Sequence, residues 1–216
     1  LKKDSKKSLS GVFKNNGIIM IIIGLVFSLL YLGLWYTISF LLGSSFEFTS
    51  FPSLRGFENY VVYSLPSAFI LYLLFAVFGA FAEEVAYRGY VQTRISGRYS
   101  YVIGIIFSSL FFSLQHIHVF SIGWIIRFFQ TQFFHVFLFG IFGGYLFFKS
   151  KENIWSVIAM HVLGNAFSVL VPIVVTHIFP FTFYVAEIVS FVVMILILHY
   201  LPLKERARYR LQSNMI

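Results

Sequence analysis

Long apolar stretches separated by short polar turns dominate the pattern of the sequence. Residues 18–42 hold 25 consecutive uncharged positions, and at about 1.5 Å per residue a helix of this length exceeds the roughly 30 Å hydrocarbon core of a bilayer. The apolar pattern predicts further helices at 62–95, 101–118, 124–148, 154–175 and 181–203. We therefore expect an all-α fold, a polytopic transmembrane bundle of about six spanning helices.

The basic residues fall between the apolar stretches and predict the orientation of the bundle. Lys and Arg are concentrated before residue 18, in the turns at 94–100 and 149–153 and in the tail, whereas the 43–60 loop holds only Arg55 and the 176–180 loop none. Because cytoplasmic loops are enriched in Lys and Arg, we expect an integral, multi-pass membrane protein with both termini in the cytoplasm.

This pattern also divides the chain into three parts. Residues 1–60 comprise a basic cytoplasmic N-terminus, the first transmembrane helix and an outer loop. The membrane core is predicted at 61–203, and residues 204–216 form a basic cytoplasmic tail.

Composition narrows the possible classes of protein. Hydrophobic residues make up 59% of the 216 positions and charged residues 11%, which excludes a soluble globular protein, a disordered chain and a coiled coil. Cys is absent, which excludes disulfides, thiolate zinc sites, Cys nucleophiles and iron–sulfur clusters. The net charge of +8 is spread between apolar stretches without a nucleic-acid motif, so the expected partner is the lipid bilayer and not nucleic acid.

Ionisable side chains inside apolar helices are costly and therefore mark candidate functional residues. Three groups stand out: Glu83-Glu84-x-x-x-Arg88, His116 and His161-x-x-x-Asn165. Counted from the nearest helix end or basic turn at about 1.5 Å per residue, Glu83, His161 and His116 lie at depths of roughly 16, 15 and 22 Å. We expect these groups, from three different helices, to meet in one intramembrane site.

Helical spacing assigns different roles to the two carboxylates. Glu84 and Arg88 are four residues apart and can pair on one face, which leaves Glu83, about 100° away, as the freer carboxylate. Such a carboxylate can act as a general base for water, or it can join His116 and His161 as ligands of a catalytic metal. In either case activated water attacks a carbonyl, while an imidazole and the Asn165 amide stabilise the oxyanion. The predicted reaction is peptide-bond hydrolysis in the membrane.

A weaker set of polar residues is assigned to structure and not to chemistry. Arg127 is expected to anchor the outer interface, His135 to be packed or hydrogen-bonded, and Glu187 to lie near the outer loop. The spacing Gly140-x-x-x-Gly144 predicts close packing between helices.

Three motifs in order carry a resemblance to a known family. Glu83–Arg88 has the form EExxxR, Phe112–His116 the form FxxxH and His161–Asn165 the form HxxxN. Together they resemble the CPBP family of intramembrane proteases (CAAX proteases and bacteriocin-processing enzymes, also called Abi), over about residues 65–180. The small, Cys-free, aromatic- and Ile-rich chain looks like a member from a bacterial cell membrane.

The resemblance implies an endopeptidase that acts on a membrane-associated protein or peptide, of the CAAX type or the leader and bacteriocin type. It makes Glu83 the water-activating carboxylate, Arg88 its companion through Glu84, His116 a second catalytic group, and His161 with Asn165 the ligand or oxyanion pair. It also implies a metalloprotease in which Glu83, His116 and His161 hold a divalent metal such as zinc, although a metal-independent glutamate and histidine mechanism remains open.

Other protease classes lack their motifs, and two other functions stay as alternatives. The sequence has no HExxH, GxGD or GxSG motif, and its sole Asp, Asp4, precedes the first helix, so an aspartyl mechanism is excluded. One alternative is a non-catalytic bacteriocin self-immunity or interaction protein with the same fold. The other is a proton-coupled transporter, against which stands the lack of a paired internal repeat.

Overall fold

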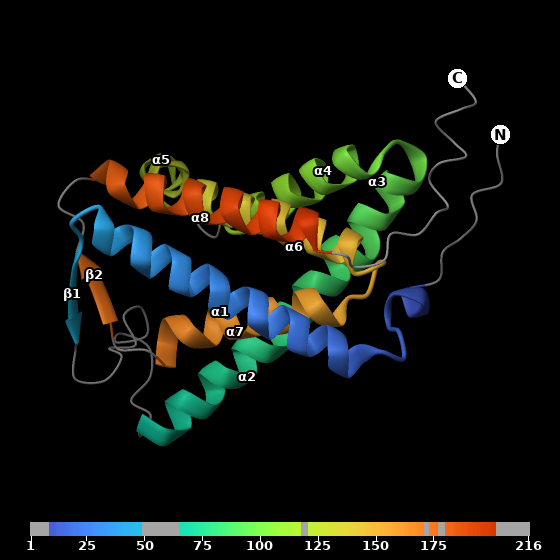
Figure 1. Ribbon diagram of the computed structural model, residues 1–216, viewed down its shortest axis with the longest axis horizontal. Coiled ribbons are helices and arrows are strands. Elements are labelled where there is room, and N and C mark those ends of the chain that lie inside the picture. Colours follow the sequence, from blue (N-terminus) through green and yellow to red (C-terminus); the bar gives the residue numbers. More distant parts are fainter. Residues whose placement is uncertain (1–8, 49–64, 118–120, 171–172, 177–179, 202–216) are drawn as a thin grey trace.

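The computed structural model describes residues 9–48, 65–117, 121–170, 173–176 and 180–201. Helices dominate these residues and confirm the predicted all-α membrane bundle (Figure 1). The helices are η1 (Leu9–Val12), α1 (Gly17–Leu41), α2 (Leu65–Glu84), the π-helical η2 (Val85–Gln92), α3 (Thr93–Arg98), α4 (Tyr101–Leu114), α5 (Ile122–Thr131), α6 (Phe133–Lys149), α7 (Trp155–Leu170) and α8 (Pro180–Tyr200). Two short strands, β1 (Ser45–Phe48) and β2 (Ile173–Thr176), pair antiparallel.

Two of the six predicted helices are interrupted. The segment predicted at 62–95 becomes α2, η2 and α3, of which residues 62–64 lie outside the described part of the chain. The segment predicted at 124–148 becomes α5 and α6, which meet at an angle of 53°. Hydropathy is continuous through both breaks, so the apolar pattern could not locate them.

Two other predicted helices end early. The helix predicted at 101–118 ends at Leu114, and the one predicted at 154–175 ends at Leu170, ahead of strand β2; residues 118 and 171–172 lie outside the described part of the chain. The sequence of β2 is Ile-Val-Val-Thr, a run of β-branched residues that favours an extended backbone over a helix. The strand was not predicted because an apolar run of this kind also fits the end of a buried helix.

Judged by helix length, the described residues contain fewer full membrane crossings than the six predicted. Among the described residues, Gly17–Leu41 and Phe181–Tyr200 are long and apolar enough to span a bilayer, and the bent pair of Ile122–Gln130 and Phe133–Lys149 gives a third. The apolar helices Tyr101–Leu114 and Trp155–Phe167 are shorter. At about 1.5 Å per residue, α4 measures roughly 21 Å, less than the bilayer core.

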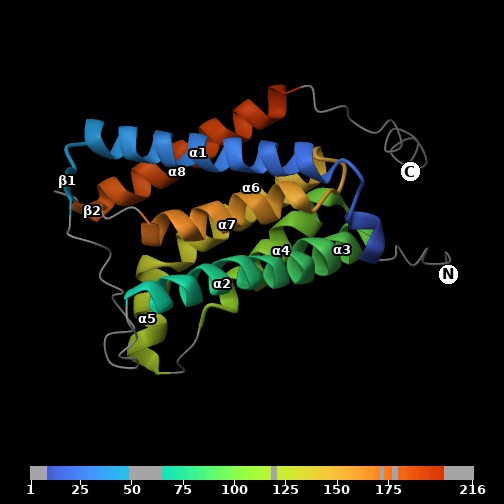
Figure 2. The same cartoon turned by 90° about the horizontal axis from the view of Figure 1, so that it is seen from below.

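The helices pack in layers around α6 and α7. Helix α7 lies between α1 and α2, and α8 crosses the bundle alongside α1 (Figure 2). Helix α6 contacts α4, α5, α7 and α8, so it occupies the centre of the bundle. The main buried apolar cluster joins α1, α6, α7 and α8 through residues such as Phe27, Phe142, Val157 and Phe191.

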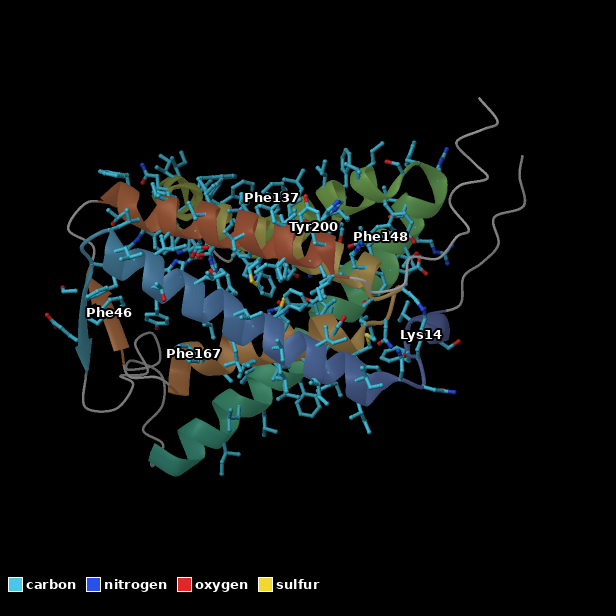
Figure 3. The ribbon with its side chains drawn as sticks, viewed as in Figure 1. Lys14, Phe46, Phe137, Phe148, Phe167 and Tyr200 are labelled. Atoms are coloured by element: carbon cyan, nitrogen blue, oxygen red, sulfur yellow. The ribbon has the colours of Figure 1, made fainter. Side chains whose placement is uncertain are left out.

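The basic turns gather at one end of the bundle. Lys14 bonds the carbonyl of Lys151, and Tyr101 bonds Glu152. Lys14 and Phe46 mark opposite ends of α1, and the β1–β2 ribbon lies at the end away from these basic turns (Figure 3). This arrangement agrees with the predicted segregation of charge, while the cytoplasmic placement of the termini stays a prediction. The tail at 204–216 lies outside the described residues.

Large apolar side chains cover the outer surface of the helices. Ile18 in α1, Phe78 in α2, Val102 in α4 and Val192 in α8 are all at least half exposed. A soluble protein would bury most of these side chains, whereas a bilayer solvates them. The protein is therefore an integral membrane protein.

The two glycines of α6 form the close helix contact that their spacing predicts. A Cβ added at Gly140 would lie 2.8 Å from Cβ of Ser109 in α4, and one added at Gly144 would lie 3.1 Å from Cγ2 of Ile105 in α4 and 2.8 Å from Oε1 of Gln92 in η2. Helices α4 and α6 can approach this closely only because both positions lack a side chain.

We expect Gly140→Ala to lower the free energy of unfolding by about 1–3 kcal/mol, because the new methyl group must push α4 away from α6. Gly79→Ala is the matched control, because nothing lies within 4 Å of a Cβ added there. Thermal unfolding of both variants in the same detergent measures the difference. Equal melting temperatures would contradict the close contact.

Candidate active site

The EExxxR motif lies where α2 passes into the π-helical segment η2. Glu84 and Arg88 are fully buried, and Arg88 Nη1 donates to Glu84 Oε1 at 3.0 Å. Arg88 also donates from Nη2 to the carbonyl of Gly140 at 3.4 Å, and its guanidinium carbon lies 4.4 Å from the ring centroid of Phe112. The expected Glu84–Arg88 pair is confirmed. π-helical turns often occur at functional sites because they change the direction in which side chains project.

His161 joins the two carboxylates of α2 from the facing helix α7. Its Nδ1 donates to Glu84 Oε1 at 2.7 Å, and its Nε2 lies 3.6 Å from Glu83 Oε2. The Glu83 side chain is 31% exposed, in contrast to the buried Glu84. Glu83 is therefore the freer carboxylate, as expected. The bond from His161 to Glu84 was not predicted, since helical spacing cannot show which residue of α7 faces α2.

His116, from the FxxxH motif, lies just after the end of α4. Its Nδ1 lies 2.9 Å from the carbonyl oxygen of Phe112, and the two rings are 5.1 Å apart. The Phe112 ring lies 5.8 Å from that of His161, so the FxxxH motif places one aromatic ring against both imidazoles. Nearby, Tyr87 of η2 donates to Gln115 Oε1 at 2.9 Å and ties this turn to the segment that follows the carboxylates.

A cavity of about 500 Å³ opens on one side of these residues. His116, His161 and Asn165 line it, together with aromatic residues of α1, α6 and α8. Asn165 lies one turn after His161 on α7 and faces the same space. Glu83 is not among the lining residues, and its recorded contact with this group is the approach of its Oε2 to Nε2 of His161. The predicted residues from α2, α4 and α7 thus converge, while their catalytic roles stay predictions.

The hydrogen bonds at Nδ1 determine the tautomer of His116 and of His161. A carbonyl oxygen and an ion-paired carboxylate oxygen only accept hydrogen bonds, so Nδ1 carries the proton in His116 and in His161. In the neutral rings Nε2 then holds a lone pair. Histidines that bind metals are held in this way by a carboxylate or a backbone carbonyl on the other nitrogen.

The three predicted metal ligands, Glu83, His116 and His161, do not come together around one point. Among the described residues, no group of three His, Cys, Asp or Glu side chains lies close enough to hold a metal ion. Glu83 and His161 approach each other, but His116 does not complete a set of three with them. This arrangement of the described residues does not fit a three-ligand metal centre.

A second polar cluster lines the same cavity. Tyr31 donates to Glu187 Oε2 at 2.9 Å, and His135 Nδ1 lies 2.9 Å from Glu187 Oε1. His135 is hydrogen-bonded, as expected. Glu187 is buried, with 2% of its side chain exposed, and its expected place near the outer loop stays a prediction. Its position in α8, seven residues into an apolar helix, was the available signal.

Arg127 is exposed on α5, and its interfacial role stays a prediction.

Comparison with known proteins gives one family. Residues 65–167 match the model of a family described as Type II CAAX prenyl endopeptidase Rce1-like. This range contains all three motifs and most of the predicted 65–180 range. No curated protein and no solved structure matches the chain.

Proposed function

We propose that the chain cleaves prenylated, membrane-associated proteins at a C-terminal C-a-a-X sequence, because residues 65–167 match the model of the Rce1-like family of type II CAAX prenyl endopeptidases. The observation that carries the proposal is the placement of His161 between two carboxylates, bonded to Glu84 and 3.6 Å from Glu83. This arrangement has the parts of a site that activates water.

The pair of Glu84 and Arg88 positions His161. Arg88 holds the Glu84 carboxylate by an ion pair, and Glu84 in turn accepts the Nδ1 proton of His161. A buried acceptor of this kind fixes both the tautomer and the orientation of the imidazole. Nε2 of His161 is thereby directed at Glu83.

Glu83 is the general base. The 3.6 Å between Glu83 Oε2 and His161 Nε2 is too long for a good direct hydrogen bond, but one water molecule can contact both atoms. Glu83 takes a proton from this water as its oxygen attacks the carbonyl carbon of the scissile bond. When the C–N bond breaks, protonated Glu83 returns the proton to the leaving amine, so the products are a carboxylate and an amine.

Asn165 and His116 are suited to stabilise the oxyanion. Both line the cavity next to His161, and the amide of Asn165 has N–H groups to donate. A protonated His116 would donate from Nε2, since Nδ1 is committed to the Phe112 carbonyl. Donors placed at the developing charge typically contribute 10²- to 10³-fold to the rate.

The cavity is suited to an apolar substrate. Its lining is mainly aromatic, including Trp35, Phe139, Phe142 and Phe183. Such a surface accepts aliphatic side chains or a lipid chain, while the polar groups around His161 lie at one part of the wall.

The test is cleavage by the full chain reconstituted in liposomes. A farnesylated peptide ending in C-a-a-X is expected to be cut within that sequence, with fragments identified by mass spectrometry. The same peptide without the lipid and a leader-type peptide serve as comparison substrates. Preferential cleavage of the leader peptide would instead favour the bacteriocin-processing branch of the family, and no cleavage of any substrate would favour the non-catalytic alternative.

We expect cleavage to survive removal of metal ions. The expectation follows from the spacing of Glu83, His116 and His161, which does not form a three-ligand centre. Metal content by mass spectrometry and cleavage rate are compared before and after dialysis against a chelator, with a zinc-dependent HExxH protease as the positive control. A rate that falls with the chelator and returns with zinc would contradict the expectation.

A further inference from the structure

The second polar cluster, formed by Tyr31, His135 and Glu187, has no role in the proposed hydrolysis. It brings together α1, α6 and α8, and all three side chains line the cavity that His116 and His161 also line. A buried carboxylate in a membrane bundle is energetically costly, and such residues therefore usually have a function. The cluster requires an explanation beyond packing.

Of the His135–Glu187 pair in this cluster, the His135 imidazole is the more exposed partner. Glu187 is buried, and both of its oxygens are occupied, Oε1 by His135 and Oε2 by Tyr31. The side chain of His135 is 40% exposed. A ligand in the cavity therefore meets His135, while Glu187 and Tyr31 hold His135 in place.

Charge balance determines what His135 offers to a ligand. A net charge on this buried pair is unfavourable, so the pair is expected to be neutral overall. It is then either a carboxylate with an imidazolium or a carboxylic acid with a neutral imidazole that accepts at Nδ1. In both forms Nε2 carries a hydrogen, so His135 donates a hydrogen bond into the cavity.

A neighbouring side chain adds a further donor. Gln132 lies three residues before His135, lines the same cavity and carries an amide N–H group. The combination of an imidazole N–H and an amide N–H suits a carboxylate.

The distance to the active site fits a short peptide. Phe139 contacts His161 with ring centroids 5.0 Å apart, and His135 lies one turn earlier on the same helix. A helical turn rises about 5–6 Å, so His135 is on the order of 10 Å from the hydrolytic site. Three extended residues cover about the same length. An enzyme that cuts within a C-terminal C-a-a-X sequence finds the terminal carboxylate of its substrate at most three residues from the cut.

We propose that His135, positioned by Glu187 and Tyr31, binds the C-terminal carboxylate of the substrate and so sets the place of the cut. The proposal rests on the proposed function and assigns a substrate-binding role to a cluster outside the three motifs. His135 touches the substrate, whereas Glu187 and Tyr31 are positioning residues.

The test compares a prenylated C-a-a-X peptide as the free acid with the same peptide as the C-terminal amide. For the full chain in lipid nanodiscs, we expect kcat/KM to be roughly 10- to 100-fold higher for the acid, mainly through KM, as for a hydrogen bond to a charged group. His135→Phe should bring the ratio close to one, Glu187→Gln should give an intermediate ratio, and Tyr31→Phe should have a smaller effect. His199→Phe, which removes an imidazole bonded to Tyr145 outside the cavity, should leave the ratio unchanged.

A binding measurement separates this proposal from the proposed function. Trp35 lines the cavity, so its fluorescence can report binding of both peptides to the Glu83→Gln variant without cleavage. Tighter binding of the acid, lost in Glu83→Gln with His135→Phe, supports the carboxylate site even if the wild-type chain cuts neither peptide. Equal binding of acid and amide, or an acid preference that survives His135→Phe, overturns it.

Discussion

Replacing Glu83 with Gln is expected to abolish peptide cleavage while leaving the protein folded. Gln has nearly the same shape but cannot take a proton from water, and loss of a general base typically lowers the rate by 10²- to 10⁴-fold. The Glu83 side chain is 31% exposed and forms no ion pair with Arg88 in the structure, so the free energy of unfolding should change by no more than about 0.5 kcal/mol. Cleavage of the prenylated peptide and thermal unfolding are measured on the same preparation.

Glu47→Gln is the matched control, because it removes the same charge from the exposed strand β1. It should cleave at the wild-type rate. If Glu83→Gln kept more than about a tenth of the wild-type rate, Glu83 would not be the base. If a biological effect of the protein persisted in a variant without cleavage, the interaction or immunity alternative would gain support.

The sequence predicted the contacts that depend on helical spacing. Glu84 and Arg88 pair because side chains four residues apart share a face, and Gly140 and Gly144 admit a neighbouring helix for the same reason. The convergence of Glu83 and His161 followed from counting residues from the basic turns. Each of these predictions needs only the geometry of a helix and the thickness of a membrane.

The contacts that were missed depend on how each helix is rotated against its neighbours. Glu187 meets His135 and Tyr31 because α8, α6 and α1 turn these faces toward one cavity, and no spacing within a single helix encodes this. The breaks at η2 and between α5 and α6 were missed because the apolar pattern continues through them. Helix packing in lipid is set by shape and polar contacts, not by hydrophobicity, so hydropathy alone carries little information about it.

This difference also explains why only one partner of Glu84 was predicted. Local spacing gave it one partner, Arg88, although the same oxygen also accepts from His161 on another helix. The ion pair therefore has two consequences that can be separated. It neutralises two charges that would be costly alone, and it fixes the ring of His161.

Arg88→Leu is expected to destabilise the fold more than Gly140→Ala or Glu83→Gln does. Arg88 and Glu84 are both fully buried, and removing Arg88 leaves an uncompensated carboxylate, which typically costs about 3–5 kcal/mol. The loss also removes the contact of Arg88 with the carbonyl of Gly140. The free energy of unfolding in mixed detergent micelles measures the effect.

The double variant Glu84→Leu with Arg88→Leu separates the two roles of the pair. Replacing both charges with apolar side chains removes the uncompensated charge, so the double variant should be more stable than Arg88→Leu alone. It should remain inactive, because Nδ1 of His161 loses its acceptor and the ring is no longer held toward Glu83. Recovery of activity together with stability would show that Glu84 serves only to neutralise Arg88. A double variant no more stable than Arg88→Leu would show that the destabilisation comes from lost packing, not from the buried charge.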